Sequence, residues 1–190
     1  MNVYDFDGTI YKKDSSVELY KYVIRYKPWL MLQCLPKQVF AIIKYKLSFI
    51  TKEEMKGIYF SFLKNIEIVS ILNKFVDHEW RNINEWYLRQ KSADDIIISA
   101  SPEFLVRAFA ERLGVAHVIA SNVDVHTGKY AGRNCCGKEK LIRLHRVFPD
   151  VIIDNFFSDS KSDIYLAQNA THAFLIVKGK IKEWNVCENE

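Results

Sequence analysis

The pattern of hydrophobic and polar positions divides this chain into a short apolar start, a long helical stretch, and a region where short strands alternate with helices. The helical stretch covers residues 14–90, and no strand signal interrupts it. Capping boxes at Ser15 and Thr51, each followed three residues later by a glutamate, predict the starts of two helices. We expect the second helix to end near Lys64 and a further helix to span 77–89.

From residue 95 onward, short β-branched runs alternate with helical signals, which is typical of a parallel sheet covered by helices on both faces. The predicted fold is therefore α/β, with a Rossmann-like parallel sheet and an inserted all-helical cap domain. Residues 1–13 and 91–190 are expected to form the core, and residues 14–90 the cap. The predicted strands lie at 3–4, 96–98, 118–120, 151–153 and 173–177, and the predicted helices at 102–113, 138–148 and 164–168, with a hairpin over 122–130.

Two carboxylates follow the first predicted strand, in the run Asp5-Phe6-Asp7-Gly8-Thr9. Side chains two residues apart on a strand point to the same side, so Asp5 and Asp7 are expected to converge on one spot. Gly8 permits a sharp turn directly after them. The alternative interpretation is an exposed acidic turn after an edge strand.

Further polar motifs follow the strands predicted at 96–98 and 151–153, and the carboxyl ends of strands are where ligands bind in open α/β sheets. The first motif is Ser99-Ala100-Ser101, in which Ser99 is favoured over Ser101 as a phosphate ligand. The second contains Asp159 and Asp163, which could also simply cap a helix.

Two lysines, Lys138 and Lys140, open the helix predicted at 138–148, where backbone amides and a lysine together favour an anion. Residues two apart on a helix do not face the same way, so only one of them can point directly into a site. The spacing to the following apolar residues favours Lys140.

These motifs, in this order along the chain, resemble the haloacid dehalogenase superfamily, in the branch that contains the phosphoserine phosphatases, and within it the phosphatidylglycerophosphatase C group. The resemblance implies a phosphatase that acts through an aspartyl-phosphate intermediate. Its pattern assigns catalytic roles to the nucleophile Asp5, the acid/base Asp7, Ser99 and Lys140, and substrate binding to Ser99, Ala100 and Lys138.

Charge balance predicts a divalent cation at this site. Four carboxylates (Asp5, Asp7, Asp159, Asp163) and a phosphate cannot share one site unaided, because like charges about 4 Å apart repel by several kcal/mol. Hard oxygen ligands suit Mg²⁺, bound by the carboxylates of Asp5 and Asp159, the backbone carbonyl of Asp7 and water. Asp163 is expected to hold a metal-bound water or to position Lys140.

Net charge is +4, and the positive charge is concentrated at 12–64, which holds 11 Lys and Arg against 4 Asp and Glu. Within this segment, the apolar runs between Trp29 and Ile43 are interrupted by Lys37 and followed by Lys44 and Lys46, and they are expected to bend or break at Pro36. No run reaches the 18 or so apolar residues of a spanning helix. An interfacial helix that meets a lipid surface and a helix that packs the cap onto the core both remain open.

The expected substrate is a phosphorylated small molecule or a phospholipid headgroup, with possible membrane contact through the cap and no nucleic acid. The alternatives are a phosphatase for soluble substrates and a non-catalytic binding module. Asp5 and Asp7 fall where a secretory leader would have to run, and the four cysteines (Cys34, Cys135, Cys136, Cys187) have no paired spacing. We therefore expect reduced thiols and a cytoplasmic protein, either free or peripheral at the inner membrane face.

Overall fold

A computed structural model describes residues 1–185, so Cys187 lies outside the described residues. Its centre is a six-stranded sheet in the order β3-β2-β1-β4-β5-β6, in which every pair except β5–β6 is parallel. The central position of β1 places its carboxyl end between those of β2 and β4. The strands are β1 Asn2–Tyr4, β2 Ile96–Pro102, β3 His117–Ser121, β4 Ile153–Ser158, β5 Ala170–Val177 and β6 Lys180–Glu183.

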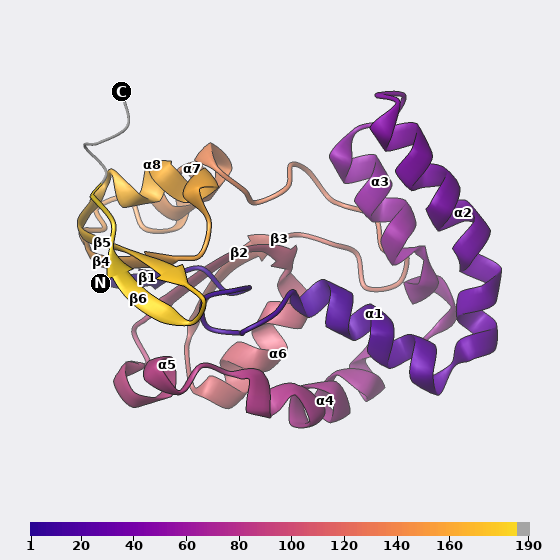
Figure 1. Ribbon diagram of the computed structural model, residues 1–190, viewed down its shortest axis with the longest axis horizontal. Coiled ribbons are helices and arrows are strands. Elements are labelled where there is room, and N and C mark those ends of the chain that lie inside the picture. The colour runs from indigo at the N-terminus through magenta and orange to yellow at the C-terminus, as the bar shows by residue number, and fades with distance from the viewer. Residues whose placement is uncertain (186–190) are drawn as a thin grey trace.

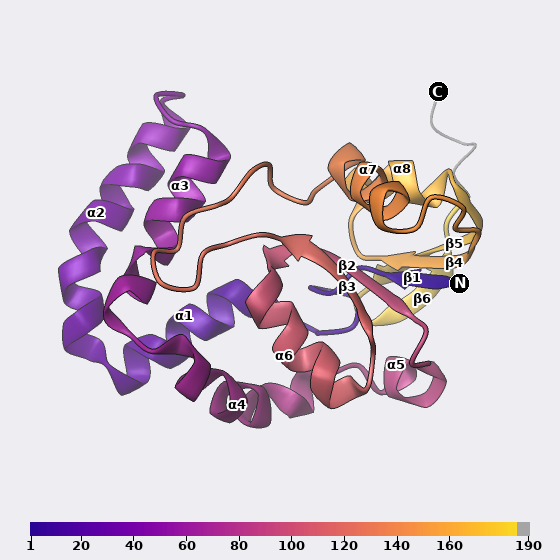
Figure 2. The same ribbon diagram turned by 180° about the vertical axis from the view of Figure 1, so that it is seen from behind.

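Helices cover both faces of this sheet (Figures 1 and 2). The helices α7 and α8 lie on one face, whereas α5 and α6 lie on the other, with α4 packed beneath α6. This arrangement confirms the predicted α/β class and the largely parallel sheet. These helices are α4 Ile68–Glu79, α5 Glu85–Gln90, α6 Glu103–Leu113, α7 Lys138–Val147 and α8 Ile164–Ala167.

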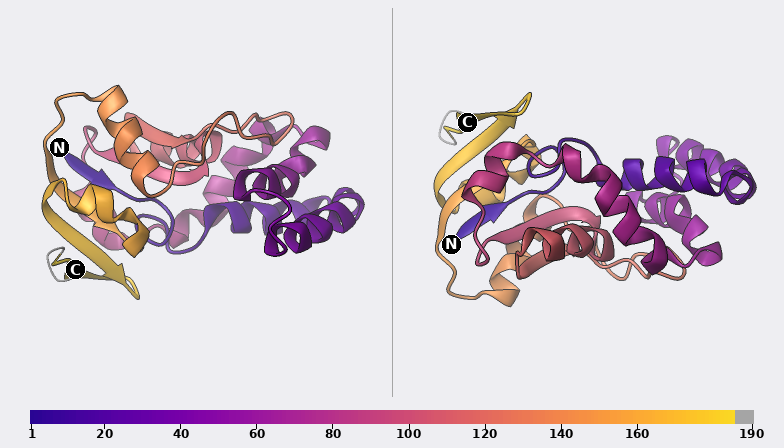
Figure 3. Two further views of the ribbon diagram at one scale, coloured as in Figure 1. Left: turned by 90° about the horizontal axis from the view of Figure 1, so that it is seen from above. Right: turned by 90° about the horizontal axis from the view of Figure 1, so that it is seen from below.

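Three helices and a 3₁₀ turn lie beyond the carboxyl ends of the central strands (Figure 3). They are α1 Ser15–Tyr26, α2 Pro28–Lys46, α3 Lys52–Tyr59 and η1 Phe60–Asn65. The capping box at Thr51 is present, and its helix is followed by η1 as far as Asn65. The division of the chain into a cap at 14–90 and a core stays a prediction.

Two details of this helical region differ from expectation. The N-cap of α1 is Asp14 rather than Ser15, since the Asp14 side chain accepts the hydrogen bond from the Val17 amide. Helix α2 continues through Pro36, so the break expected there as one of two outcomes is wrong, and the bend stays a prediction. None of the described helices is both long enough and apolar enough to cross a membrane.

The single helix predicted over 77–89 is also wrong. Helix α4 ends at Glu79, and a 3₁₀ turn, η2 Trp80–Asn82, separates it from α5. The helix is interrupted here, where the Asn84 amide donates to the Ile10 carbonyl and the Asn84 side chain donates to the carbonyl of Thr9. These long-range bonds hold the segment against the turn that follows β1.

The strand predicted at 151–153 begins at Ile153 and continues to Ser158. It passes through Asp154, which is exposed at the amino end, and then buries Phe156 and Phe157 between its neighbours. Strand β6 was not predicted, because all four of its residues are exposed and its pattern carries no buried side.

One hydrophobic cluster joins the helices beyond the sheet to the sheet itself. Phe60 and Phe75 belong to the same buried cluster as Phe6 and Phe109, and the Phe75 and Phe109 rings meet edge to face at 5.9 Å. The segment after β3 reaches this region: a Cβ added at Gly128 would lie 2.2 Å from the Phe60 carbonyl oxygen. Of the hairpin predicted over 122–130, one antiparallel bridge forms, between Val123 and Tyr130.

Candidate active site

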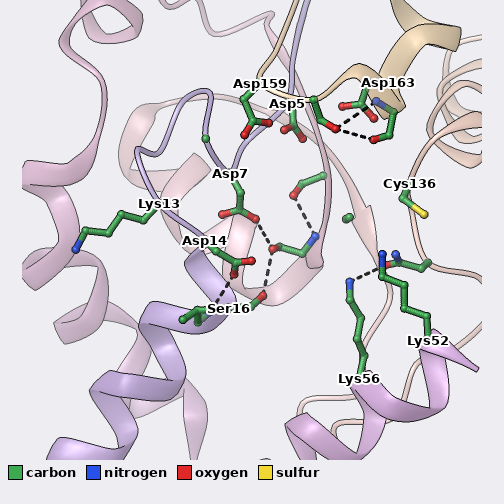
Figure 4. Close-up of a pocket in the computed structure, with 18 of the residues that line it drawn as sticks. Asp5, Asp7, Lys13, Asp14, Ser16, Lys52, Lys56, Cys136, Asp159 and Asp163 are labelled. Atoms are coloured by element: carbon green, nitrogen blue, oxygen red, sulfur yellow. Dashed lines mark hydrogen bonds between the residues drawn. The ribbon is translucent and has the colours of Figure 1, made fainter. Parts of the chain in front are cut away.

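Asp5 and Asp7 lie at the carboxyl end of the central strand β1 (Figure 4). The Asp5 amide donates to the Phe157 carbonyl at 2.8 Å, so the ladder to β4 fixes the backbone at this point. Gly8 then turns the chain with φ +75°, and a Cβ there would lie 2.0 Å from Asp159 Oδ2. The turn after β1 and the loop after β4 are therefore in direct contact.

Lys140, in the first turn of α7, lies buried between two carboxylates. Its Nζ donates to Asp5 Oδ1 and to Asp163 Oδ2, both at 2.7 Å, and only 3% of the residue is exposed. Ser158 Oγ donates to the same Asp163 oxygen at 2.8 Å. Burial by itself lowers the pKa of Lys140, but the two carboxylates outweigh it and raise that pKa, so the ammonium stays charged.

Negative charge exceeds positive charge around Asp5. Burial raises the pKa of Asp5, and Asp163 and Asp7 add to the increase, whereas Lys140 opposes it. Burial also raises the pKa of Asp159, whose carboxyl group meets that of Asp5. Lys140 pairs with two of these carboxylates, Asp5 and Asp163, and the net negative charge that is left favours a further cation.

Asp7 has different partners from Asp5. Its Oδ1 accepts from the Ser15 amide at 2.7 Å, and its Oδ2 accepts from Ser101 Oγ at 2.5 Å. Burial raises the pKa of Asp7 to about 6, although these hydrogen bonds oppose the rise. Two carboxylates with different environments are what separate nucleophile and acid/base roles require.

Ser99 and Ala100 line the same pocket, at the end of β2. Ser99 is buried, and its Oγ accepts from the Ser101 amide at 3.1 Å. Lys138 is exposed and is not among the described residues that line the pocket. The structure therefore brings together every predicted site residue except Lys138.

A family model described as haloacid dehalogenase-like hydrolase matches residues 3–168. The chain belongs to this family. Among curated proteins it is 29% identical to Protein CicA of Caulobacter vibrioides, over 93% of this chain and 86% of that protein. The fold is similar to a protein of unknown function from Bordetella pertussis Tohama I (TM-score 0.74, 17% identity, covering 91% of this chain and 87% of that one). It is also similar to a substrate-bound phosphoserine phosphatase (TM-score 0.58, 14% identity, covering 90% and 82%).

In this haloacid dehalogenase-like hydrolase the site opens into a pocket of about 740 Å³. The sheet side of the pocket carries the carboxylates, Lys140 and the serines, whereas helices α2 and α3 form the opposite wall. That wall is lined by Ile42, Lys52, Met55, Lys56 and Tyr59.

Sequence reasoning missed two groups of this pocket. Ser101 was weighed only as a phosphate ligand, and no pattern in the sequence indicates its bond to Asp7. Lys52 and Lys56 were treated only as part of a basic segment, although their spacing of four on a predicted helix could have shown that they share a face.

Proposed function

We propose that this chain is a Mg²⁺-dependent phosphatase that hydrolyses phosphomonoesters through an aspartyl phosphate on Asp5. The observation that carries the proposal is the pairing of Asp5 with Lys140 at 2.7 Å, beside an Asp7 that has separate partners. Asp5 is then free to act as the nucleophile, and Asp7 as the proton donor and acceptor.

In the first step, an Asp5 oxygen bonds to phosphorus as the ester bond breaks, and Asp7 gives its proton to the leaving oxygen. In the second step, Asp7 takes a proton from water, the water oxygen bonds to phosphorus, and the bond to Asp5 breaks. Lys140 and the Ser99 hydroxyl offset negative charge on the phosphoryl oxygens in both steps. The products are an alcohol and inorganic phosphate.

The residues present fit a magnesium ion. No group of three or more His, Cys, Asp or Glu side chains within residues 1–185 forms a ready-made metal site. However, Mg²⁺ commonly uses only one or two carboxylates and keeps several waters. Asp5 and Asp159, whose carboxyl groups interact, would hold it together with the Asp7 carbonyl. When bound, the ion supplies charge stabilisation for the transferring phosphoryl group.

Asp163 is better suited to positioning Lys140 than to binding the magnesium ion directly. One of its oxygens already accepts from both Lys140 and Ser158, at 2.7 and 2.8 Å. It therefore fixes the ammonium that faces Asp5, which agrees with one of its two expected roles.

For the substrate, we favour a phospholipid headgroup. Helix α2 exposes apolar side chains on the face opposite buried Cys34 and Ala41, and Lys37 and Lys44 flank this face. We call this face the outer stripe of α2; its members are Trp29, Leu32, Val39, Phe40, Ile43 and, just past the helix, Leu47.

The outer stripe matches the chemistry of an anionic membrane surface, with apolar side chains for the acyl region and lysines for the headgroups. Ile42 of the same helix lines the pocket, so the helix that would contact lipid also borders the site. Free thiols at Cys34, Cys135 and Cys136 are in keeping with the cytoplasm, and we place the contact at the inner membrane face. The fold likeness to a phosphoserine phosphatase favours the alternative, a soluble phosphomonoester.

The test is Mg²⁺-dependent phosphate release from phosphatidylglycerophosphate in mixed micelles and from a panel of soluble phosphomonoesters. Asp5→Asn should reduce release at least 10³-fold, because the nucleophile is lost. Asp150→Asn, which changes an exposed aspartate outside the pocket, is the matched control and should behave as the wild type.

Preference for the lipid by orders of magnitude in kcat/KM supports the headgroup proposal. Preference for phosphoserine or another soluble ester supports the alternative instead. Absence of release above the Asp5→Asn blank from every substrate contradicts the phosphatase proposal and leaves a binding module.

A further inference from the structure

The wall of the pocket opposite the carboxylates carries two lysines that the proposed chemistry does not use. Lys52 and Lys56 lie one helical turn apart on α3, and both extend from that helix into the pocket, toward the loop that holds Cys136 (Figure 4). Residues four apart share a helix face, so the two ammonium groups act on the same region.

Neither lysine has an acidic partner within ion-pair distance among residues 1–185. Lys56 Nζ donates to Asn134 Oδ1 at 3.2 Å and lies 5.7 Å from the centre of the Tyr130 ring. Both contacts are with neutral groups. Burial, followed by the nearby charge of Lys52, lowers the pKa of Lys56, whereas Cys136, Asp14 and Asp7 oppose the decrease.

The groups around Lys56 hold it in place. Asn134 is buried, its Oδ1 also accepts from Ser121 Oγ at 2.9 Å, and its Nδ2 has no hydrogen-bond partner within the described chain. A half-buried cation held by neutral groups, with no ion-pair partner in the described part of the chain, is better suited to an anion subsite than a solvated surface lysine is.

This cation pair is separate from the position of the scissile phosphoryl group. That group must lie beside Asp5, where Lys140 already contacts the nucleophile, whereas Lys52 and Lys56 belong to the facing helix wall. A pocket of about 740 Å³ holds far more than one phosphoryl group. Asp14 and Asp7 also line the pocket, and their negative charges partly offset that of Lys56.

We propose that Lys52 and Lys56 bind a second anionic group of the substrate, so that this enzyme selects phosphomonoesters that also carry a phosphodiester or a carboxylate. This inference rests on the proposed phosphatase function. A monoester that carries a phosphodiester is the chemistry of a phosphorylated glycerophospholipid headgroup, and a monoester with a carboxylate is that of a phosphorylated hydroxy acid.

The test compares three soluble substrates that differ in the second group: glycerol 3-phosphate, with none; glycerophosphoglycerol phosphate, with a phosphodiester; and 3-phosphoglycerate, with a carboxylate. The variants are Lys52→Met and Lys56→Met, which keep an unbranched side chain of nearly the same length and remove its charge. Lys64→Met, at an exposed lysine outside the pocket lining, is the matched control.

The wild type is expected to favour one of the two doubly anionic esters over glycerol 3-phosphate in kcat/KM, and which one it favours identifies the second group. Lys56→Met should reduce this preference about tenfold, through KM rather than kcat, since about 1.4 kcal/mol of binding corresponds to that factor. An unchanged preference in both variants, or an equal loss with all three esters, overturns the proposal.

A second readout does not depend on turnover. Calorimetric titration of each of the two doubly anionic esters into Asp5→Asn protein, with and without Lys56→Met, measures binding at the subsite directly. If this binding depends on Lys56 but the wild type turns over none of the esters, the phosphatase function is refuted and the subsite is retained. If the wild type turns over the esters but neither binding nor turnover depends on Lys56, the subsite is refuted and the phosphatase function is retained.

Discussion

At the scale of single residues, the site holds buried charged side chains that do not help to stabilise the fold. Lys140, Asp5 and Asp163 are all buried, and a buried ion pair has to overcome the cost of removing both charges from water. Replacing such groups by packed apolar residues is often neutral or stabilising, so stability gives little reason to keep them. Their arrangement fits the phosphoryl transfer proposed above, which needs the nucleophile and its counter-charge already in place.

Gly8 offers a sharp test of this arrangement. Gly8→Ala should reduce kcat/KM at least 100-fold, because the added Cβ would lie 2.0 Å from Asp159 Oδ2 and would displace that proposed metal ligand. Gly114→Ala is the matched control, since Gly114 has a similar φ of +72° but nothing within 4 Å of the added Cβ. Both variants carry the backbone strain of about 1–2 kcal/mol, which thermal unfolding measures. Equal activity of the two variants would show that Asp159 does not need its present position.

How far the sequence predicts the site depends on whether a residue acts within its own motif. Asp5, Asp7 and the pair Asp159 and Asp163 could be predicted because each follows a strand, and the ends of parallel strands meet. The Ser101 bond to Asp7 could not be predicted, because it joins residues 94 positions apart and depends on the side-chain rotamers of both.

At the scale of elements, α2 is the helix whose pattern is least explained by packing. It is apolar on the side that buries Cys34 and Ala41 and apolar again on the outer stripe, and it continues through Pro36. A helix that only covered the core would carry polar residues on its exposed side. The outer stripe is therefore expected to contact a partner, and we propose that this partner is a membrane surface.

We predict that the protein sediments with vesicles of anionic phosphatidylglycerol more strongly than with phosphatidylcholine vesicles, and that added salt weakens this binding. Leu32→Ser combined with Ile43→Ser should weaken it at least tenfold, because each apolar side chain contributes about 1.5–3 kcal/mol when fully buried. Ile152→Ser, at an exposed apolar residue far from α2 in the sequence, is the control and should bind as the wild type. Vesicle binding that the double variant leaves intact would assign the stripe another role.

Other elements show where local patterns fail. The chain between α4 and α5 has residues that favour a helix, but the bonds of Asn84 to Ile10 and Thr9 hold it in another conformation. Those partners are distant in the sequence, so no local pattern predicts them. Strand β4 was predicted at 151–153, but it begins at Ile153 and continues past Asp154, which lies at its exposed amino end. The strands with both sides buried, such as Ile96–Ile98 within β2, were predictable because their apolar runs are continuous.

At the scale of the whole molecule, the pocket lies between two walls of different charge. The wall at the strand ends carries the carboxylates and Lys140, and the helical wall carries Lys52 and Lys56. The buried cluster that includes Phe60, Phe75 and Phe109 joins the two parts of the chain that form these walls. From this difference between the two walls, we expect the phosphoryl group to react at the strand ends and the helical wall to select the substrate.

The measurement that tests the central claim most directly is the capture of the phosphoryl group on the enzyme. Asp7→Asn should slow hydrolysis of the intermediate, because Asp7 is the proposed base for water. With an aryl phosphate, whose leaving group needs no proton, formation of the intermediate should persist. Rapid mixing with Mg²⁺ and labelled ester, followed by acid quench and peptide mapping, should place the label on Asp5. A label on another residue, or wild-type turnover by Asp5→Asn, would contradict the account.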